Sequence, residues 1–145
     1  MTIDLKILLL TLLLLTGTWL KAQTVVIDIL NIRNNNGVIR LAVFTSEQTF
    51  RKETPLFEKV VHKNEIEEGK LTAEINLPYP GTFGIALLDD ENNNEKLDYR
   101  FFIPSEGIGF SNYQHKTLRR PHFSDFCFEV TNNSEMKVEI IIRYY

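Results

Sequence analysis

The sequence predicts an all-β protein, an antiparallel sandwich of two sheets with about seven strands. Hydrophobic side chains recur at every second position over much of the chain, as they do in strands with one buried face. Short groups of Asn, Gly and Pro separate these runs and predict turns. A chain of 145 residues with ten Phe has enough apolar side chain for one core. We therefore expect one domain with an immunoglobulin-like or transthyretin-like sandwich. A barrel is the alternative, because strand number alone does not fix closure.

The first 22 residues differ from the rest of the chain. A short polar start with Lys6 precedes an aliphatic run from Ile7 to Leu15, and Ala22 offers a small residue for cleavage. This pattern is typical of a secretory signal peptide. The run is roughly half of the ~20 apolar residues that span a bilayer. We expect cleavage after Ala22, a periplasmic or secreted domain over residues 23–145, and no membrane span after cleavage.

Seven segments of the remaining chain are rich in β-branched or aromatic residues and predict strands. They are residues 24–32, 38–45, 57–62, 71–77, 82–88, 126–130 and 136–144. The alternation predicts that Phe83, Ile85, Leu87, Phe126, Phe128, Val138 and Ile140 are buried. Turns are expected at Asn36-Gly37, Glu68-Gly69, Pro80-Gly81 and residues 132–134. Only residues 46–54 predict a helical turn, with Phe50 as its apolar contact.

Charge and cysteine content exclude some classes of function. The chain has 16 Lys and Arg against 19 Asp and Glu, a net charge of −3, and no basic stripe. Nucleic acid is therefore not an expected partner. Cys127 is the single cysteine and cannot form an internal disulfide. Because it lies between Phe126 and Phe128, we expect a buried and inert thiol.

Residues 89–110 form the longest stretch without strand alternation, and long loops on a rigid scaffold often carry function. Oxygen-bearing groups recur there at alternate positions, as in a calcium-binding loop. The predicted ligands are the side chains of Asp90, Asn92, Asn94 and Asp98 and the carbonyl of Lys96. The match to an EF-hand is partial, because Glu95 stands at the glycine position and Phe101 at the bidentate glutamate position. The alternative is a turn held by its own Asn and Asp side chains.

The segment from residue 81 to residue 130 resembles the domain-of-unknown-function 2141 family of small exported bacterial proteins. The resemblance rests on Gly81, Asp90, Glu91, Asn92, Asn94, Lys96, Leu97, Asp98, Pro104, Glu106, Gly107, Gly109, Phe110, Ser111, Asn112, Phe123, Asp125 and Phe128. The family pattern has histidine where Asp89 stands and glycine at the positions of Asn93 and Glu95. We therefore expect this loop to be stiffer than one that has both glycines. The resemblance implies an exported β-rich domain and no particular activity.

The histidines do not assemble a recognisable catalytic or zinc motif. His115 and His122 are seven residues apart, which is not a zinc-ligand spacing on a helix or hairpin, and we expect both in a solvated loop. His122, Ser124 and Asp125 are the residue types of a hydrolase triad. On one strand, however, Asp125 would point to the opposite face from the other two.

These patterns favour a non-catalytic envelope or secreted module. Its long loop would bind calcium or present a surface to an envelope protein or a glycan, and we expect a monomer. Arg119 and Arg120 form a small basic cluster that suits an anionic glycan or a lipid head group. A hydrolase acting on envelope polymers through Asp98 and Glu106 is the alternative, and a structural domain without a ligand is a third reading.

Overall fold

The computed structural model describes residues 23–132 and 135–145, and it is all-β. Residues 1–22, which hold the predicted signal peptide, and residues 133–134, in the predicted last turn, lie outside the described residues. One sheet contains β1 (Gln23–Leu30), β4 (Leu71–Leu77) and β10 (Met136–Ile141). The second contains β2 (Val38–Phe44), β3 (Phe57–His62), β5 (Gly81–Asp90), β8 (Gly107–Phe110) and β9 (Cys127–Val130).

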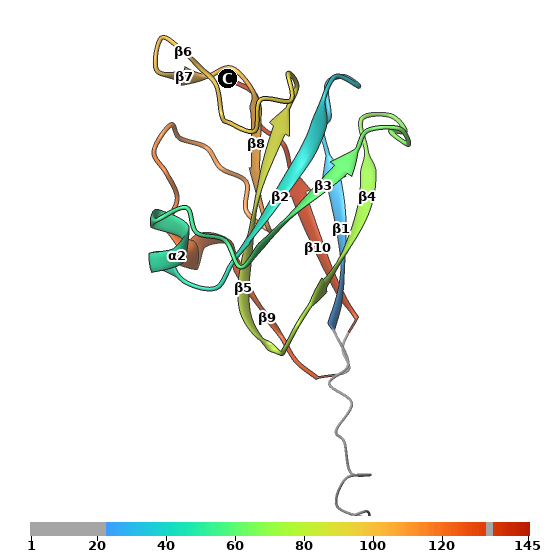
Figure 1. The fold of residues 1–145 in the computed structure, drawn as a ribbon, viewed down its shortest axis with the longest axis vertical. Helices are drawn as coiled ribbons and strands as arrows, with labels where there is room; N and C mark the ends of the chain where they lie inside the picture. Colours follow the sequence, from blue (N-terminus) through green and yellow to red (C-terminus); the bar gives the residue numbers. More distant parts are fainter. Residues whose placement is uncertain (1–22, 133–134) are drawn as a thin grey trace, which may run out of the picture.

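The two sheets have the strand orders β10-β1-β4 and β3-β2-β5-β8 (Figure 1). The long strand β5 pairs with β9 through its first half and with β8 through its second half. A third, two-stranded sheet is the hairpin of β6 (Tyr99–Arg100) and β7 (Ile103–Pro104). The pairing within the described ranges gives separate sheets rather than a closed barrel.

The prediction of purely antiparallel sheets is wrong at one pair. Strands β1 and β10 run parallel, with Ile27 opposite Val138 and Ile29 opposite Ile140. Parallel neighbours need a long connection, and here almost the whole domain lies between the first and last strands. The other strand pairs in the described residues are antiparallel.

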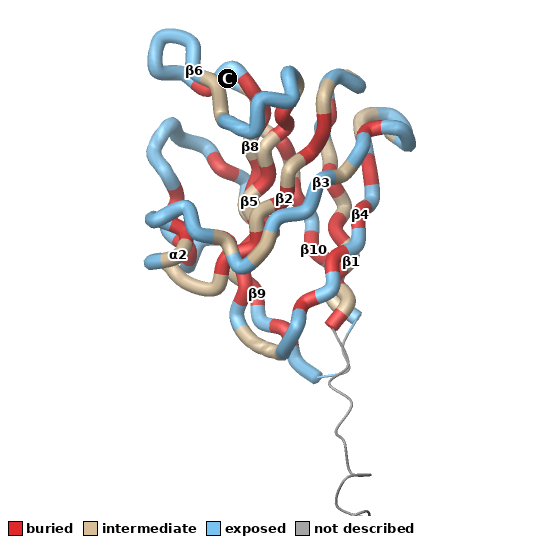
Figure 2. Tube along the Cα trace, viewed as in Figure 1, coloured by how far each residue is buried: buried red, intermediate tan, exposed pale blue. Residues whose placement is uncertain are grey.

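One hydrophobic core lies between the two large sheets (Figure 2). It takes alternate residues of β1, β4 and β10 from one side and of β2 and β5 from the other. All seven side chains that the alternation predicts to be buried are buried. Every residue of this core and of a second aromatic cluster lies between Val25 and Ile142. The chain from Gln23 onward therefore contains the complete described fold.

All seven predicted segments contain strands, and the structure adds β6, β7 and β8 within residues 89–110. The predicted helical turn is α2 (Glu47–Arg51), which Ser46 caps through the backbone N–H of Thr49 at 3.2 Å and whose Phe50 is buried. A second short helix, α3 (Phe123–Phe126), was not predicted. Phe126 belongs to it, so the strand predicted from residue 126 begins at Cys127.

The edge strand β8 connects the two sheets. Ile108 and Arg143 exchange two backbone hydrogen bonds of 3.0 and 2.8 Å. Gly107 and Gly109 permit this approach: a Cβ atom on Gly107 would overlap Ile142 and Tyr144, and one on Gly109 would lie 2.5 Å from a methyl of Ile140. The absence of side chains on the inner face of β8 therefore holds the following loop close to the C-terminal strand.

Candidate functional site

The predicted calcium loop begins later than the sequence indicated. Asp89 and Asp90 are the last residues of β5, and both are fully buried. The irregular segment starts at Glu91 and runs to the β6–β7 hairpin. The loop thus directly follows β5, a central strand of the five-stranded sheet.

Asp90 holds the start of the loop in place. Its carboxylate accepts hydrogen bonds from the backbone N–H groups of Asn94 at 3.1 Å and Glu95 at 3.0 Å, and from Arg40 Nε at 2.6 Å. Burial alone would raise the pKa of Asp90, but the Arg40 hydrogen bond and the two backbone donors leave it below its ordinary value. Asp90 is therefore an ion-paired anchor for the turn.

Three of the five predicted calcium ligands meet at Asp98. Its Oδ2 accepts hydrogen bonds from the side-chain amides of Asn92 at 2.6 Å and Asn94 at 2.8 Å. The oxygens of those amides accept the backbone N–H groups of Asn94 at 3.0 Å and Lys96 at 2.9 Å. Of the four predicted ligand side chains, Asn92, Asn94 and Asp98 converge, whereas Asp90 pairs with Arg40. The two amides, moreover, direct their nitrogen atoms rather than their oxygens toward Asp98. These are the contacts of an Asx-stabilised turn.

Lys96 enters this network through its N–H group. Across the described ranges, no group of three or more His, Cys, Asp or Glu side chains is arranged to hold a metal ion. Calcium binding through the loop stays a prediction.

Glu106, the residue before β8, connects the loop to that strand. Its two carboxylate oxygens accept the backbone N–H groups of Glu91 at 3.1 Å and Asp98 at 3.3 Å. Burial raises the pKa of Glu106, and the two N–H donors oppose this rise. Both oxygens of this predicted hydrolase residue are therefore engaged in holding the loop.

A buried polar network supports the start of the loop, and no pattern in the sequence indicated it. Asp89 is ion-paired with Lys63 and accepts a hydrogen bond from Tyr144 Oη at 2.6 Å. Lys63 also donates to the carbonyl of Asn36 at 2.7 Å. These groups come from distant segments, and only the fold brings them together.

An exposed aromatic turn lies at the far end of the loop. Phe101 and Phe102 form the two-residue turn between β6 and β7, with 86% and 96% of their surface exposed. Both have positive φ angles, of 50° and 65°. Residues with a Cβ atom rarely adopt this region, and bulky ones least of all.

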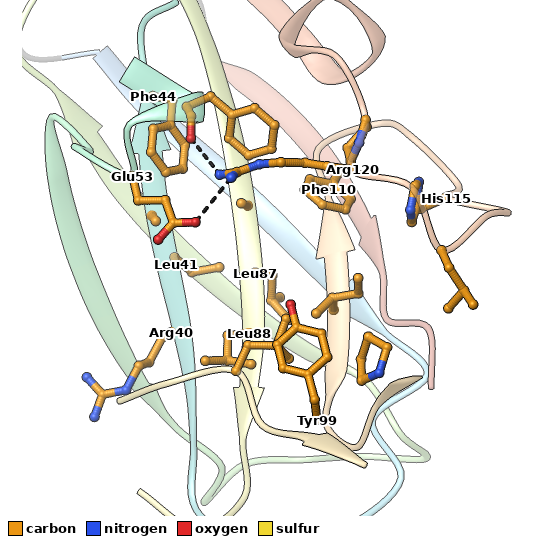
Figure 3. Close-up of a pocket in the computed structure, with 18 of the residues that line it drawn as sticks. Arg40, Leu41, Phe44, Glu53, Leu87, Leu88, Tyr99, Phe110, His115 and Arg120 are labelled. Atoms are coloured by element: carbon orange, nitrogen blue, oxygen red, sulfur yellow. Dashed lines mark hydrogen bonds and ion pairs between the residues drawn. The ribbon is translucent and has the colours of Figure 1, made fainter. Parts of the chain in front are cut away.

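A groove of about 590 Å³ lies on the outer face of the five-stranded sheet (Figure 3). Its floor includes Ala42 of β2, Ala86 and Leu88 of β5, and Ile108 of β8, where a solvent face normally carries polar side chains. The hairpin contributes Tyr99 and Phe102 to one wall, and residues 118–121 contribute to another. The volume is in the range of small-molecule sites.

An aromatic cluster closes one end of the groove. Phe44, Phe50, Phe110, Phe123 and Phe126 pack against one another there, with edge-to-face contacts around Phe50. The Arg120 guanidinium stacks over the Phe50 ring at 4.4 Å and donates to Glu53 at 3.1 Å. Figure 3 shows Arg120 extended along this end of the groove. The end wall is therefore rigid.

His115 is the buried polar side chain of the groove wall. The prediction of a solvated His115 is wrong, because the residue is 5% exposed and packs against Phe110 and Tyr113. Burial, together with the charge of Arg143, lowers its pKa, so the ring is neutral at pH 7. Its Nδ1 atom is buried and has no hydrogen-bond partner among the described residues.

The residues of the suggested triad have structural contacts instead. Asp125 Oδ2 accepts the backbone N–H of His122 at 2.8 Å, which closes the first turn of α3. His122 is exposed beside Glu47 and Arg51, and Ser124 is exposed. Cys127, expected to be buried, is half-buried.

These features define a class of protein, a β-rich domain with a loop-walled groove on the outer face of one sheet. The chain belongs to the family described as uncharacterized protein conserved in bacteria, domain of unknown function 2141, whose model matches residues 27–139. The family resemblance seen in the sequence is thereby confirmed. Comparisons with curated proteins and with solved structures gave no match. In the ranges that the structure describes, no helix combines the length and apolarity needed to cross a bilayer.

Proposed function

We propose that the protein is an exported, non-catalytic binding module of the periplasm or the extracellular space. The groove on the five-stranded sheet is its binding site. The observation that carries the proposal is the apolar outer face of β2, β5 and β8, walled by two loops rather than left open to water. An apolar concave surface of this size with a few polar groups is the usual form of a ligand site. The shared core of the two sheets supports a sandwich of the immunoglobulin-like or transthyretin-like kind.

The lining sets the chemistry of the ligand. Leu88, Ile108 and Phe110 offer apolar contact along the floor and end, which suits an acyl chain or a ring system. The Arg119 guanidinium, which makes no ion pair in the described ranges, offers a polar contact at the wall. We infer an amphipathic ligand whose polar end is anionic or carries a hydroxyl or amide group.

The test is ligand binding by the chain from Gln23 onward. A fluorescent long-chain fatty acid should bind the wild type, and Ala86→Phe, which fills the floor, should reduce affinity at least tenfold. Asn76→Phe places the same ring on the exposed face of β4 and should leave affinity unchanged. Equal binding by all three proteins, or none by the wild type, would rule out the groove as an acyl-chain site.

The export part of the proposal rests on the pattern of the first 22 residues. When the gene is expressed in a Gram-negative host, the protein should be recovered outside the cytosol with an N-terminus at or near Gln23. Soluble cytosolic protein that begins at Met1 would contradict it.

Weak calcium binding by residues 90–98 is a second candidate function. The observation that favours it is the meeting of Asn92 and Asn94 at the Asp98 carboxylate. Rotation of both amides would turn their oxygens toward the same point, at the cost of two Asx hydrogen bonds. Affinity would be in the weak range of about 10⁻⁴–10⁻³ M, because Asp98 is then the main carboxylate ligand.

A further inference from the structure

The turn between β6 and β7 carries the two most exposed large apolar side chains of the described residues. Phe101 and Phe102 are 86% and 96% exposed, and Tyr99 and Ile103 beside them are 62% and 43% exposed. The hairpin projects at the edge of the molecule, away from both large sheets (Figure 1). These rings therefore contribute little to the core of the domain.

The backbone of the turn has unfavourable φ angles at Phe101 and Phe102, and burial of their side chains does not offset this strain. A two-residue hairpin turn with positive φ at both positions favours Asn-Gly, and here both positions are Phe. Such backbone conformations are unfavourable for residues with a Cβ atom and cluster at functional sites. The turn therefore presents two phenyl rings to solvent at the tip of a short hairpin.

Basic side chains that make no ion pair in the described ranges lie on the hairpin and in the segments next to it. Arg100 of β6, Lys96 of the preceding loop and Arg119 of the neighbouring groove wall are exposed and make no ion pair in the described ranges. The acidic groups of the preceding loop have contacts within the domain: Glu95 lies 3.2 Å from Arg40, Asp98 accepts two side-chain amides, and Glu106 is buried. Residues 113–122 include no acidic residue.

We propose that Phe101 and Phe102 insert into the interfacial region of a lipid bilayer with anionic headgroups, with Arg100 and Lys96 beside the headgroup phosphates. Aromatic side chains next to Lys and Arg are the chemistry that binds this interface. Two Phe rings bury about 150–250 Å² each. A stable protein interface buries about 800 Å² per partner, so a bilayer fits this small convex tip better than a folded partner does. Phe102 also lines the groove wall, but the inference uses no residue of the groove floor and requires no groove ligand.

The first experiment measures binding to vesicles by the chain from Gln23 onward. Phe102→Trp introduces a reporter, because the only Trp of the sequence is Trp19. Vesicles containing phosphatidylglycerol should shift its emission to the blue, and brominated acyl chains should quench it. Pure phosphatidylcholine vesicles should bind it more weakly, by about fivefold for each basic side chain at the surface.

The second experiment replaces the turn in the wild type. The double variant Phe101→Asn, Phe102→Gly suits the positive φ angles, so it should unfold at or above the wild-type temperature. Its sedimentation with phosphatidylglycerol vesicles should nevertheless fall at least tenfold. Arg100→Gln should lose affinity for anionic vesicles only, and Ala86→Phe should bind vesicles like the wild type.

The outcomes separate this inference from the proposed groove. Loss of vesicle binding in Ala86→Phe but not in the Asn-Gly variant would assign lipid contact to the groove and overturn the role of the turn. Unchanged binding by the Asn-Gly variant, or no binding of the wild type to either vesicle, would also overturn it. In the last case a protein partner would be the remaining occupant of the turn.

Discussion

Asp90, the last residue of β5, and Asp98, in the loop that follows, are nearby carboxylates with different structural roles. Asp90 is fully buried and neutralises Arg40, whereas Asp98 is partly exposed and accepts two side-chain amides. Removing one partner of a buried ion pair is costly because the other charge is left uncompensated. The same substitution should therefore have very different effects at the two positions.

We predict that Asp90→Ala lowers the free energy of unfolding by about 3–5 kcal/mol. Asp98→Ala should cost about 1 kcal/mol, because it removes hydrogen bonds near the surface. Urea unfolding of the two variants beside the wild type measures both values. Similar costs would mean that Asp90 is not the anchor of the loop.

At the residue scale, the sequence predicted which loop side chains lie close together better than it predicted their hydrogen-bond and ion-pair partners. Alternate spacing correctly brought Asn92, Asn94 and Asp98 together. It did not indicate that Asp90 is held by Arg40, which is fifty residues away in the chain. The burial of His115 was missed for the same reason, since its neighbours Phe110 and Arg143 are set by tertiary packing.

At the scale of elements, calcium binding by residues 90–98 can be tested through its effect on stability. If calcium binds, millimolar calcium should stabilise the fold by on the order of 1–2 kcal/mol at tenfold saturation. Thermal melts with calcium and with chelator measure this, and Asp98→Ala should remove the difference. Asp98→Ala is the better test than Asp90→Ala, because the loss of Asp90 should destabilise the fold even in the absence of calcium. Equal melting temperatures in all conditions would leave an Asx-stabilised turn.

Strands were more predictable than the short helix α3. Period-two alternation is local and marks strands such as β4 clearly. Phe126 and Phe128 alternate as in a strand, yet Phe123 and Phe126 share one face of a helical turn and both enter the aromatic cluster. A four-residue helix is too short for its period to be distinguished from that of the following strand. The parallel partner of β1 was equally hidden, because pairing across the whole chain has no local signature.

For the molecule as a whole, pH should reveal the ion pairs that hold the loops. The Arg33 guanidinium lowers the pKa of Glu91 below its ordinary 4.5, and Asp90 lies below its ordinary 3.8. A carboxyl with a lowered folded pKa contributes stability above its unfolded pKa and loses it as pH falls through the folded value. Burial raises the pKa of Glu106, so its contribution has the opposite sign and decreases as pH rises above 4.5.

We predict that melting temperature falls steeply once pH drops below about 4, where the unfolded chain binds protons at Asp90 and Glu91 more readily than the folded protein does. Arg33→Gln should be less stable than the wild type at pH 7, with a smaller further loss on acidification. Thermal melts across that range measure both slopes. Parallel curves for the two proteins would show that the Arg33–Glu91 pair does not contribute to acid sensitivity.

We propose that the outer face of the five-stranded sheet binds the ligand. Backbone amide chemical shifts, recorded while a long-chain fatty acid is added to the chain from Gln23 onward, test it most directly. We expect saturable shifts at Ala42, Ala86, Ile108 and His115, with the amides of β1 and β4 unchanged. Shifts concentrated on the sheet of β10, β1 and β4, or no shifts at saturating fatty acid, would contradict it.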